Sequence, residues 1–141
     1  MDSSIPQFAL SVRQPWAWCI LHAGKDIENR SWGTRMRGPI ALHAAKGLTQ
    51  AEFADCLETI QTLSEDAPFP AGITMPTIEE LQRGGIVGVV EIVDSVQQSS
   101  SPWFFGKHGF RLANPCPVEF VPVKGELGFF DWRKNLEGSR R

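Results

Sequence analysis

The segment 13–46 concentrates the side chains that could do chemistry. It begins with Arg13 and Gln14, which stand just before Pro15, a residue suited to the first turn of a helix. Free backbone N–H groups at a helix N-terminus attract anions, and a guanidinium can hold a phosphate through two hydrogen bonds. Arg13 therefore indicates phosphate binding, with an ordinary ion pair to a carboxylate as the alternative.

An acid, a base and an aromatic ring follow at alternate positions of segment 25–32. In an extended strand Glu28, Arg30 and Trp32 share one face, and Lys25 falls on the other. Glutamate and arginine supply hydrogen bonds and tryptophan a stacking surface, which together suit a nucleobase. A surface Glu–Arg pair would give the same pattern without a ligand, so both interpretations stay open.

Two lysines and one glutamate are the candidates for acid–base catalysis. Lys46 follows His43 at the end of an expected strand and could contact phosphate or, if buried, act as a base. Glu91 falls on one face of a strongly apolar strand, together with valines, where a carboxylate is costly unless it is paired. A pair with Lys25 in a cleft would be a proton-transfer couple or a structural ion pair, and we hold both open.

The sequence offers little for a bound metal or nucleotide phosphate loop. It contains no GxxxxGK[ST], GxGxxG or GxSxG motif. Its three cysteines form no CxxC pair, and its three histidines stand at unrelated spacings. We therefore expect no cofactor and no metal site, and the need for a divalent cation in solution stays open.

Composition indicates one globular domain. The 141 residues are 42% hydrophobic, and no apolar run approaches the ~18–20 residues of a membrane span. We therefore expect a cytoplasmic protein without membrane contact. Residues 13–46 contain six basic and two acidic residues, which gives a net charge of +4. Residues 47–104 contain one basic and nine acidic residues, which gives a net charge of −8. This asymmetry favours local contact with a polyanion, although an unevenly charged solvated surface is equally compatible.

The elements that must position these side chains are short. Strands are expected at 8–12, 25–32, 39–45, 86–96, 104–112, 118–123 and 128–132. Helices are expected between Pro15 and Gly24, over an acidic stretch at 49–63 that opens with a capping box, and briefly at 77–84. This order predicts an α+β fold with a partly closed barrel of five to six strands and flanking helices. We expect a single domain over 1–141, with its core at about 9–132 and a basic tail at 133–141.

Several motifs resemble those of the ASCH (activating signal cointegrator homology) domain. They are LSVRQPWA at 10–17, GK at 24–25, ENRSW at 28–32, RGP at 37–39, HAAK at 43–46, the strand at 85–94 and VPVKG at 121–125. The resemblance covers residues 9–132 and implies a PUA-like barrel whose neighbouring cleft is associated with RNA. It implies binding of single-stranded RNA or a nucleotide, and the cleft motifs carry over to Arg13, Gln14, Lys25, Glu28, Arg30 and Lys46. Together with the basic charge of segment 13–46, it leads us to expect phosphate contacts from the basic residues of this set and from Arg37, base contacts from Gln14 and Glu28, and stacking on Trp32.

The resemblance also implies two enzymatic alternatives. Some members of this family are ribonucleases, which would place Lys46 at the centre of a mechanism, and others hydrolyse N4-acetylcytidine. The amidohydrolases resemble this chain at Lys25 and Glu91, but they have a threonine where this chain has Glu28. A third hypothesis is a regulatory interaction module that binds a protein partner through the acidic helix at 49–63.

Overall fold

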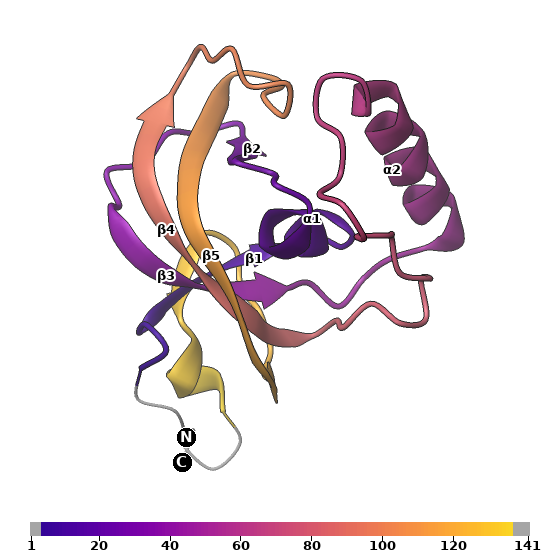
Figure 1. Ribbon diagram of the computed structural model, residues 1–141. Helices are drawn as coiled ribbons and strands as arrows, with labels where there is room; N and C mark the ends of the chain where they lie inside the picture. The colour runs from indigo at the N-terminus through magenta and orange to yellow at the C-terminus, as the bar shows by residue number, and fades with distance from the viewer. Residues whose placement is uncertain (1–3, 137–141) are drawn as a thin grey trace.

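Six strands, two α-helices and a short 3₁₀ helix make up the described part of the chain. The computed structural model describes residues 4–136 (Figure 1). In chain order the elements are β1 (Phe8–Val12), α1 (Trp16–His22), β2 (Ile27–Arg30), β3 (Gly38–Ala44), α2 (Gln50–Leu63), β4 (Gly85–Val96), β5 (His108–Pro122), β6 (Phe129–Asp131) and the 3₁₀ helix η1 (Trp132–Asn135).

All six strands belong to one curled sheet with the order β2-β5-β4-β3-β1-β6. Strands β1 and β3 run parallel, and the other neighbours are antiparallel. The long pair β4–β5 has three register shifts, which bend and twist it as β-bulges do. The sheet therefore curves into a partly closed barrel (Figure 1).

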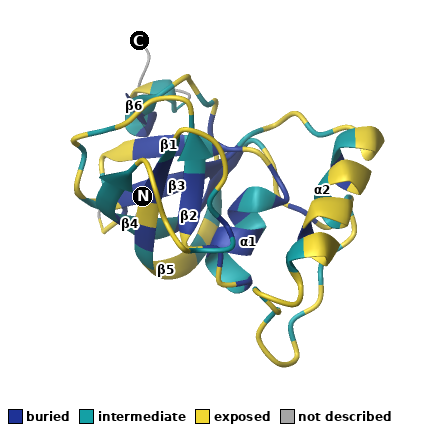
Figure 2. Ribbon diagram, turned by 90° about the horizontal axis from the view of Figure 1, so that it is seen from above, coloured by how far each residue is buried: buried dark blue, intermediate teal, exposed yellow. Residues whose placement is uncertain are grey.

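Helix α1 packs against the sheet beside the barrel (Figure 2). Its apolar stripe buries Cys19 and Ile20, as the i, i+3, i+4 spacing predicts. One core cluster joins Ile20 to residues of the central strands, among them Leu42, Val90 and Phe110. The arrangement confirms the expected α+β fold, a PUA-like half-barrel with flanking helices.

Helix α2 lies farther out, with α1 between it and the sheet (Figure 2). The predicted capping box is present, because Thr49 and Glu52 exchange hydrogen bonds at the helix start. Only Phe53 and Ile60 of this helix are buried, and its outward face is exposed. No helix in residues 4–136 is long and apolar enough to cross a membrane.

Two expected elements are wrong. Thr77 and Glu80 make the hydrogen bonds of a capping box, but the segment after Thr77 forms only a turn and no helix follows. The strands expected at 104–112 and 118–123 form one strand, β5. Its partner β2 pairs only with residues 108–111, so Pro115 and Pro117 lie where β5 borders β4 alone and can be tolerated.

The described residues include only the first part, 133–136, of the tail expected at 133–141. Residues up to Asn135 form η1, in which Trp132 is fully buried and donates its indole N–H to the carbonyl of Pro6 at 2.7 Å. Residues 137–141 lie outside the described part of the chain.

Candidate functional site: a charged cleft beside β2

A carboxylate held between two cations forms the centre of a cleft beside β2. Glu28 Oε1 lies 3.4 Å from Lys25 Nζ, and Glu28 Oε2 lies 3.0 Å from Arg30 Nη2. The lysine and the glutamate are 5% and 8% exposed. Lys25 and Glu28 are buried and Arg30 is partly exposed, and the three side chains of this triad together carry one net positive charge. The carboxylate compensates the charge of both cations.

The local backbone explains why Lys25 reaches Glu28. Alternation in a continuous strand predicts opposite faces for them, but β2 begins only at Ile27, so Lys25 precedes the strand. Its ammonium folds back and also donates to the carbonyl of Ile27. The expectation that Lys25 lies away from Glu28 is therefore wrong, whereas Arg30 does share the face of Glu28, as predicted.

Aromatic rings line the deeper part of the cleft. A hollow of about 240 Å³ is lined by Lys25, Glu28, Trp16, Asn29, Thr59, Trp103 and Phe105. The Lys25 ammonium lies 6.0 Å from the ring centre of Trp16. Asn29 fixes the opposite wall, because its amide donates to the carbonyl of Trp103 and accepts from the N–H of Phe105.

A second hollow of about 370 Å³ adjoins the first and shares Trp16, Glu28 and Asn29 with it. It adds Arg13, Arg30 and Trp32 from the predicted set. The structure thus brings Arg13, Lys25, Glu28, Arg30 and Trp32 into one composite cleft.

Trp32 is positioned by neighbouring rings. It makes edge-to-face contacts with Phe110 and Phe129 at centroid distances of 5.2 and 5.9 Å, yet 36% of it remains exposed. An oriented, accessible ring of this kind is a suitable stacking surface.

Arg13 joins the cleft to helix α2. Its guanidinium pairs with Glu52 in the first turn of α2, and both side chains are well exposed. The capping hydrogen bond from the Thr49 backbone, aided by Arg13, lowers the pKa of Glu52 below its ordinary value. Such an exposed ion pair is weak, and another anion could replace the carboxylate.

The side chain of Gln14 is buried, and its amide group is hydrogen-bonded within the fold. Its side-chain oxygen accepts from the N–H of Trp18 at 2.9 Å, and its nitrogen donates to the carbonyl of Gln82 at 2.8 Å. Because the residue is only 3% exposed, its amide is occupied in linking the start of α1 to the segment before β4. The structure therefore does not support the expected contact of Gln14 with a base.

Arg37 lies outside the cleft. It bonds the carbonyls of Thr34 and Met36 and approaches Asp94 at 3.6 Å, beside the first residue of β3. Lys46 follows the opposite end of the same seven-residue strand, about 20 Å away at ~3.3 Å per residue. The predicted phosphate contacts therefore do not form one continuous patch.

Lys25 and Glu91 do not form the expected pair, because each has another partner. Glu91 accepts a hydrogen bond from Asn114 at 3.0 Å, whereas Lys25 is paired with Glu28. The register shifts of β4 place Val87 on the core side with Val90, and leave Glu91 partly exposed. The premise of a carboxylate on a uniformly apolar face is thus wrong.

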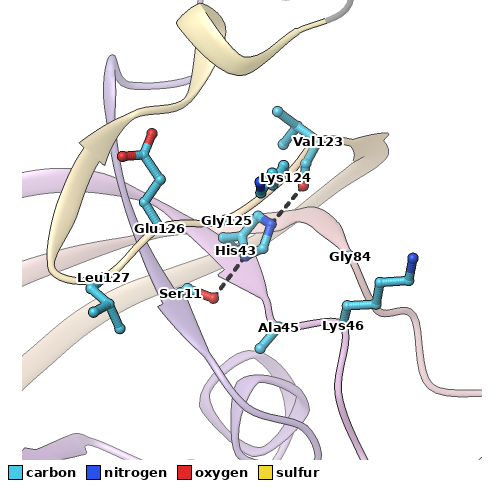
Figure 3. A pocket seen from close by; sticks show the side chains of 10 residues that line it. All are labelled: Ser11, His43, Ala45, Lys46, Gly84, Val123, Lys124, Gly125, Glu126 and Leu127. Carbon is cyan, nitrogen blue, oxygen red and sulfur yellow. Dashed lines mark hydrogen bonds between the residues drawn. The ribbon is translucent and has the colours of Figure 1, made fainter.

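A hollow of about 730 Å³ lies at the end of β3 (Figure 3). Lys46 lines it beside Ser11 and His43, two residues whose spacing in the sequence gives no sign that they meet. The backbone of Ser11 borders the charged cleft on its other side, because Arg30 donates to the Ser11 carbonyl at 2.8 Å. Among the described residues, no group of three or more His, Cys, Asp or Glu side chains could hold a metal ion.

Comparison with known proteins identifies a family that the chain resembles. The profile of the ASCH domain matches residues 10–129, which include the whole cleft. Human Activating signal cointegrator 1 is 31% identical over 93 residues, which make up 64% of this chain. The matched segment covers 15% of the length of that relative, so this chain corresponds to only a small part of it.

Proposed function

This chain belongs to the ASCH domain family, and on that premise we propose that it binds single-stranded RNA, with one nucleotide seated in the charged cleft beside β2. The observation that carries the proposal is the buried Glu28 carboxylate, held between Lys25 and Arg30 in a hollow bordered by tryptophans.

The triad suits the polar edge of a nucleobase. Oε2 of Glu28 is contacted by both Nε and Nη2 of Arg30, whereas Oε1 is contacted by the Lys25 ammonium and can accept a further hydrogen bond. A carboxylate accepts from the exocyclic amino group of a base such as cytosine. Because both cations fix the carboxylate in place, little side-chain freedom is lost when a base binds.

Two tryptophans and two arginines complete the site. Trp32 offers a stacking surface at the open end, and Trp16 borders both hollows. Arg13 is half exposed, so a phosphate can take the place of Glu52 at its guanidinium. Stacking combined with cationic contacts is the usual basis of single-strand binding.

Catalytic alternatives receive less support from the geometry. Lys46 lies in a different hollow, and Lys25 and Glu91 have separate partners. Ribonuclease and amidohydrolase activity in the cleft therefore remain proposals without an assembled catalytic group. The acidic outer face of α2 as a protein-binding surface also stays a prediction.

Equilibrium binding of labelled single-stranded RNA, followed by fluorescence anisotropy over a range of salt concentrations, tests the proposal. Binding should weaken linearly in log–log coordinates as salt rises, since phosphate contacts release counterions. A duplex of the same sequence should bind less tightly, because its bases cannot enter the cleft. Binding that does not respond to salt, or that favours the duplex, would overturn the proposal.

A further inference from the structure

Ser11 and His43 are joined inside the hollow of about 730 Å³ (Figure 3). They are direct register partners on the parallel strands β1 and β3, and the Oγ–Nδ1 distance is 2.9 Å. The other ring nitrogen, Nε2, lies 2.8 Å from the carbonyl oxygen of Val123. The charged cleft uses none of these side chains.

The carbonyl of Val123 fixes the direction of both hydrogen bonds. A carbonyl oxygen can only accept, so Nε2 of His43 carries the hydrogen and donates it. Burial lowers the pKa of His43 below its ordinary 6.5, which favours the neutral ring at pH 7. Nδ1 is then an unprotonated acceptor, and the Ser11 hydroxyl donates to it. Ser11, His43 and the Val123 carbonyl therefore form a hydrogen-bonded chain of nucleophile, base and orienting group.

The loop after β5 passes very close to this pair. A Cβ atom on Gly125 would lie 2.6 Å from Cε1 of His43 and 3.2 Å from Oγ of Ser11, so a side chain there would displace them. Within the described part of the chain, the backbone N–H groups of Gly125 and Glu126 donate to no other group. These two N–H groups therefore keep hydrogen-bonding capacity for an oxyanion that comes within their reach.

We propose that Ser11 is a nucleophile and His43 its general base. The protein then hydrolyses small carboxylic esters that carry one negative charge and bind in this hollow. Ala45, Val123 and Leu127 give the hollow apolar walls for the acyl group. Lys46 and Lys124, both exposed at its border, supply attraction for the anion. Glu126 is the third charged residue in the lining of the hollow, and its carboxylate accepts a hydrogen bond of 2.8 Å from the Asn135 amide.

The reaction balances without a cofactor. Oγ of Ser11 attacks the ester carbonyl while its proton passes to Nδ1 of His43. The tetrahedral intermediate then expels the alcohol, which takes the proton from Nδ1 and leaves an acyl-serine. Water attacks this ester, gives a proton to Nδ1 and releases the carboxylic acid as Oγ recovers its proton.

The test uses the full chain and two p-nitrophenyl esters, the neutral butyrate and the anionic hemisuccinate. The Ser11→Ala and His43→Gln substitutions should each lower kcat/KM at least a hundredfold, the lower end of the ~10²–10⁴ effect of a general base. Lys46→Met and Lys124→Met should raise KM for the anionic ester only. Ser99→Ala, in an exposed loop, and His22→Gln, on α1, serve as matched controls and should retain full activity.

A second test labels the unsubstituted protein, so its result does not depend on whether the variants fold. A fluorophosphonate should modify Ser11, which peptide mass spectrometry would locate, and should leave Ser99 unmodified. Absence of the label at Ser11, or equal ester turnover by a folded Ser11→Ala variant, would overturn the proposal. RNA binding by the charged cleft is measured separately, so its failure would not be confused with failure of the esterase.

Discussion

Ser11 and His43 are direct register partners across the parallel pair β1–β3, and a hydrogen bond of 2.9 Å joins their side chains. The same histidine ring donates to the Val123 carbonyl of the loop after β5. A single buried imidazole thus connects three segments that are far apart in sequence, and its protonation state affects the stability of all three.

Stability should fall with acidification because His43 is buried in its neutral form. Its pKa is lowered in the fold, chiefly by burial, from an unfolded value of 6.5. Below that pH the unfolded chain binds more protons, so the stabilisation is complete above pH 6.5 and is lost as pH falls toward the folded pKa. The unfolding free energy, measured in urea at intervals between about pH 7 and pH 5, should decline in this window.

The His43→Gln variant is the control for this pH dependence. It should have a flatter profile over the same range, because glutamine does not titrate. The Glu52 and Glu80 carboxyls do not interfere, since hydrogen bonds from Thr49 and Thr77 lower their pKa values below 4.5. Parallel profiles of variant and unaltered protein would show that another group is responsible.

The Glu28→Gln substitution should destabilise the fold substantially. It removes the charge that compensates the Lys25 ammonium, whose side chain is 4% exposed. Breaking a buried pair in this way costs about 3 kcal/mol, which chemical denaturation can measure. Glu91→Gln is the matched control and should cost less than about 0.5 kcal/mol, because Glu91 is partly exposed and bonded to an amide. Equal losses for both variants would contradict the account of the triad.

The Trp32→Ala substitution should weaken the binding of single-stranded RNA about tenfold or more, since stacking contributes ~1–3 kcal/mol per base. Trp32→Phe should retain most of the affinity. Phe8→Ala removes a ring that is 41% exposed on β1 but lines none of the hollows described above. If the Phe8 and Trp32 variants lost affinity equally, stacking at Trp32 would not be the cause.

The Arg30→Met substitution should change the salt dependence of binding. Loss of one phosphate contact reduces the slope of log K against log salt by about 0.7 for a single strand. Arg111→Met, at an exposed arginine of β5, should leave the slope unchanged. An unaltered slope for Arg30→Met would restrict this residue to holding Glu28 and the Ser11 carbonyl.

Local patterns predicted most of the fold. Strand β1 and the capping box of α2 follow from short-range spacing, and so does the buried stripe of α1. The Glu28–Arg30 contact was predictable as well, because both residues lie on one face of a single strand. Lys25 was misplaced because strand alternation was extended past the first residue of β2.

Long-range register explains what local patterns missed. Ser11 and His43 are 32 residues apart, and only the parallel pairing of β1 with β3 brings them together. The bulges of β4 changed which residues face the core and removed the apparent anomaly of Glu91. The charge count of segment 13–46 could not reveal that Arg37 and Lys46 lie at opposite ends of β3.

Photo-crosslinking tests the proposed binding of RNA in the cleft most directly. A short single-stranded RNA containing 4-thiouridine would be irradiated with the protein, with and without divalent cation, and the crosslinked peptides mapped by mass spectrometry. The proposal predicts crosslinks within residues 25–32, centred on Trp32, and loss of this crosslink in Trp32→Ala. Crosslinks confined to residues 43–46 and 123–127, or no salt-sensitive crosslink at all, would contradict it.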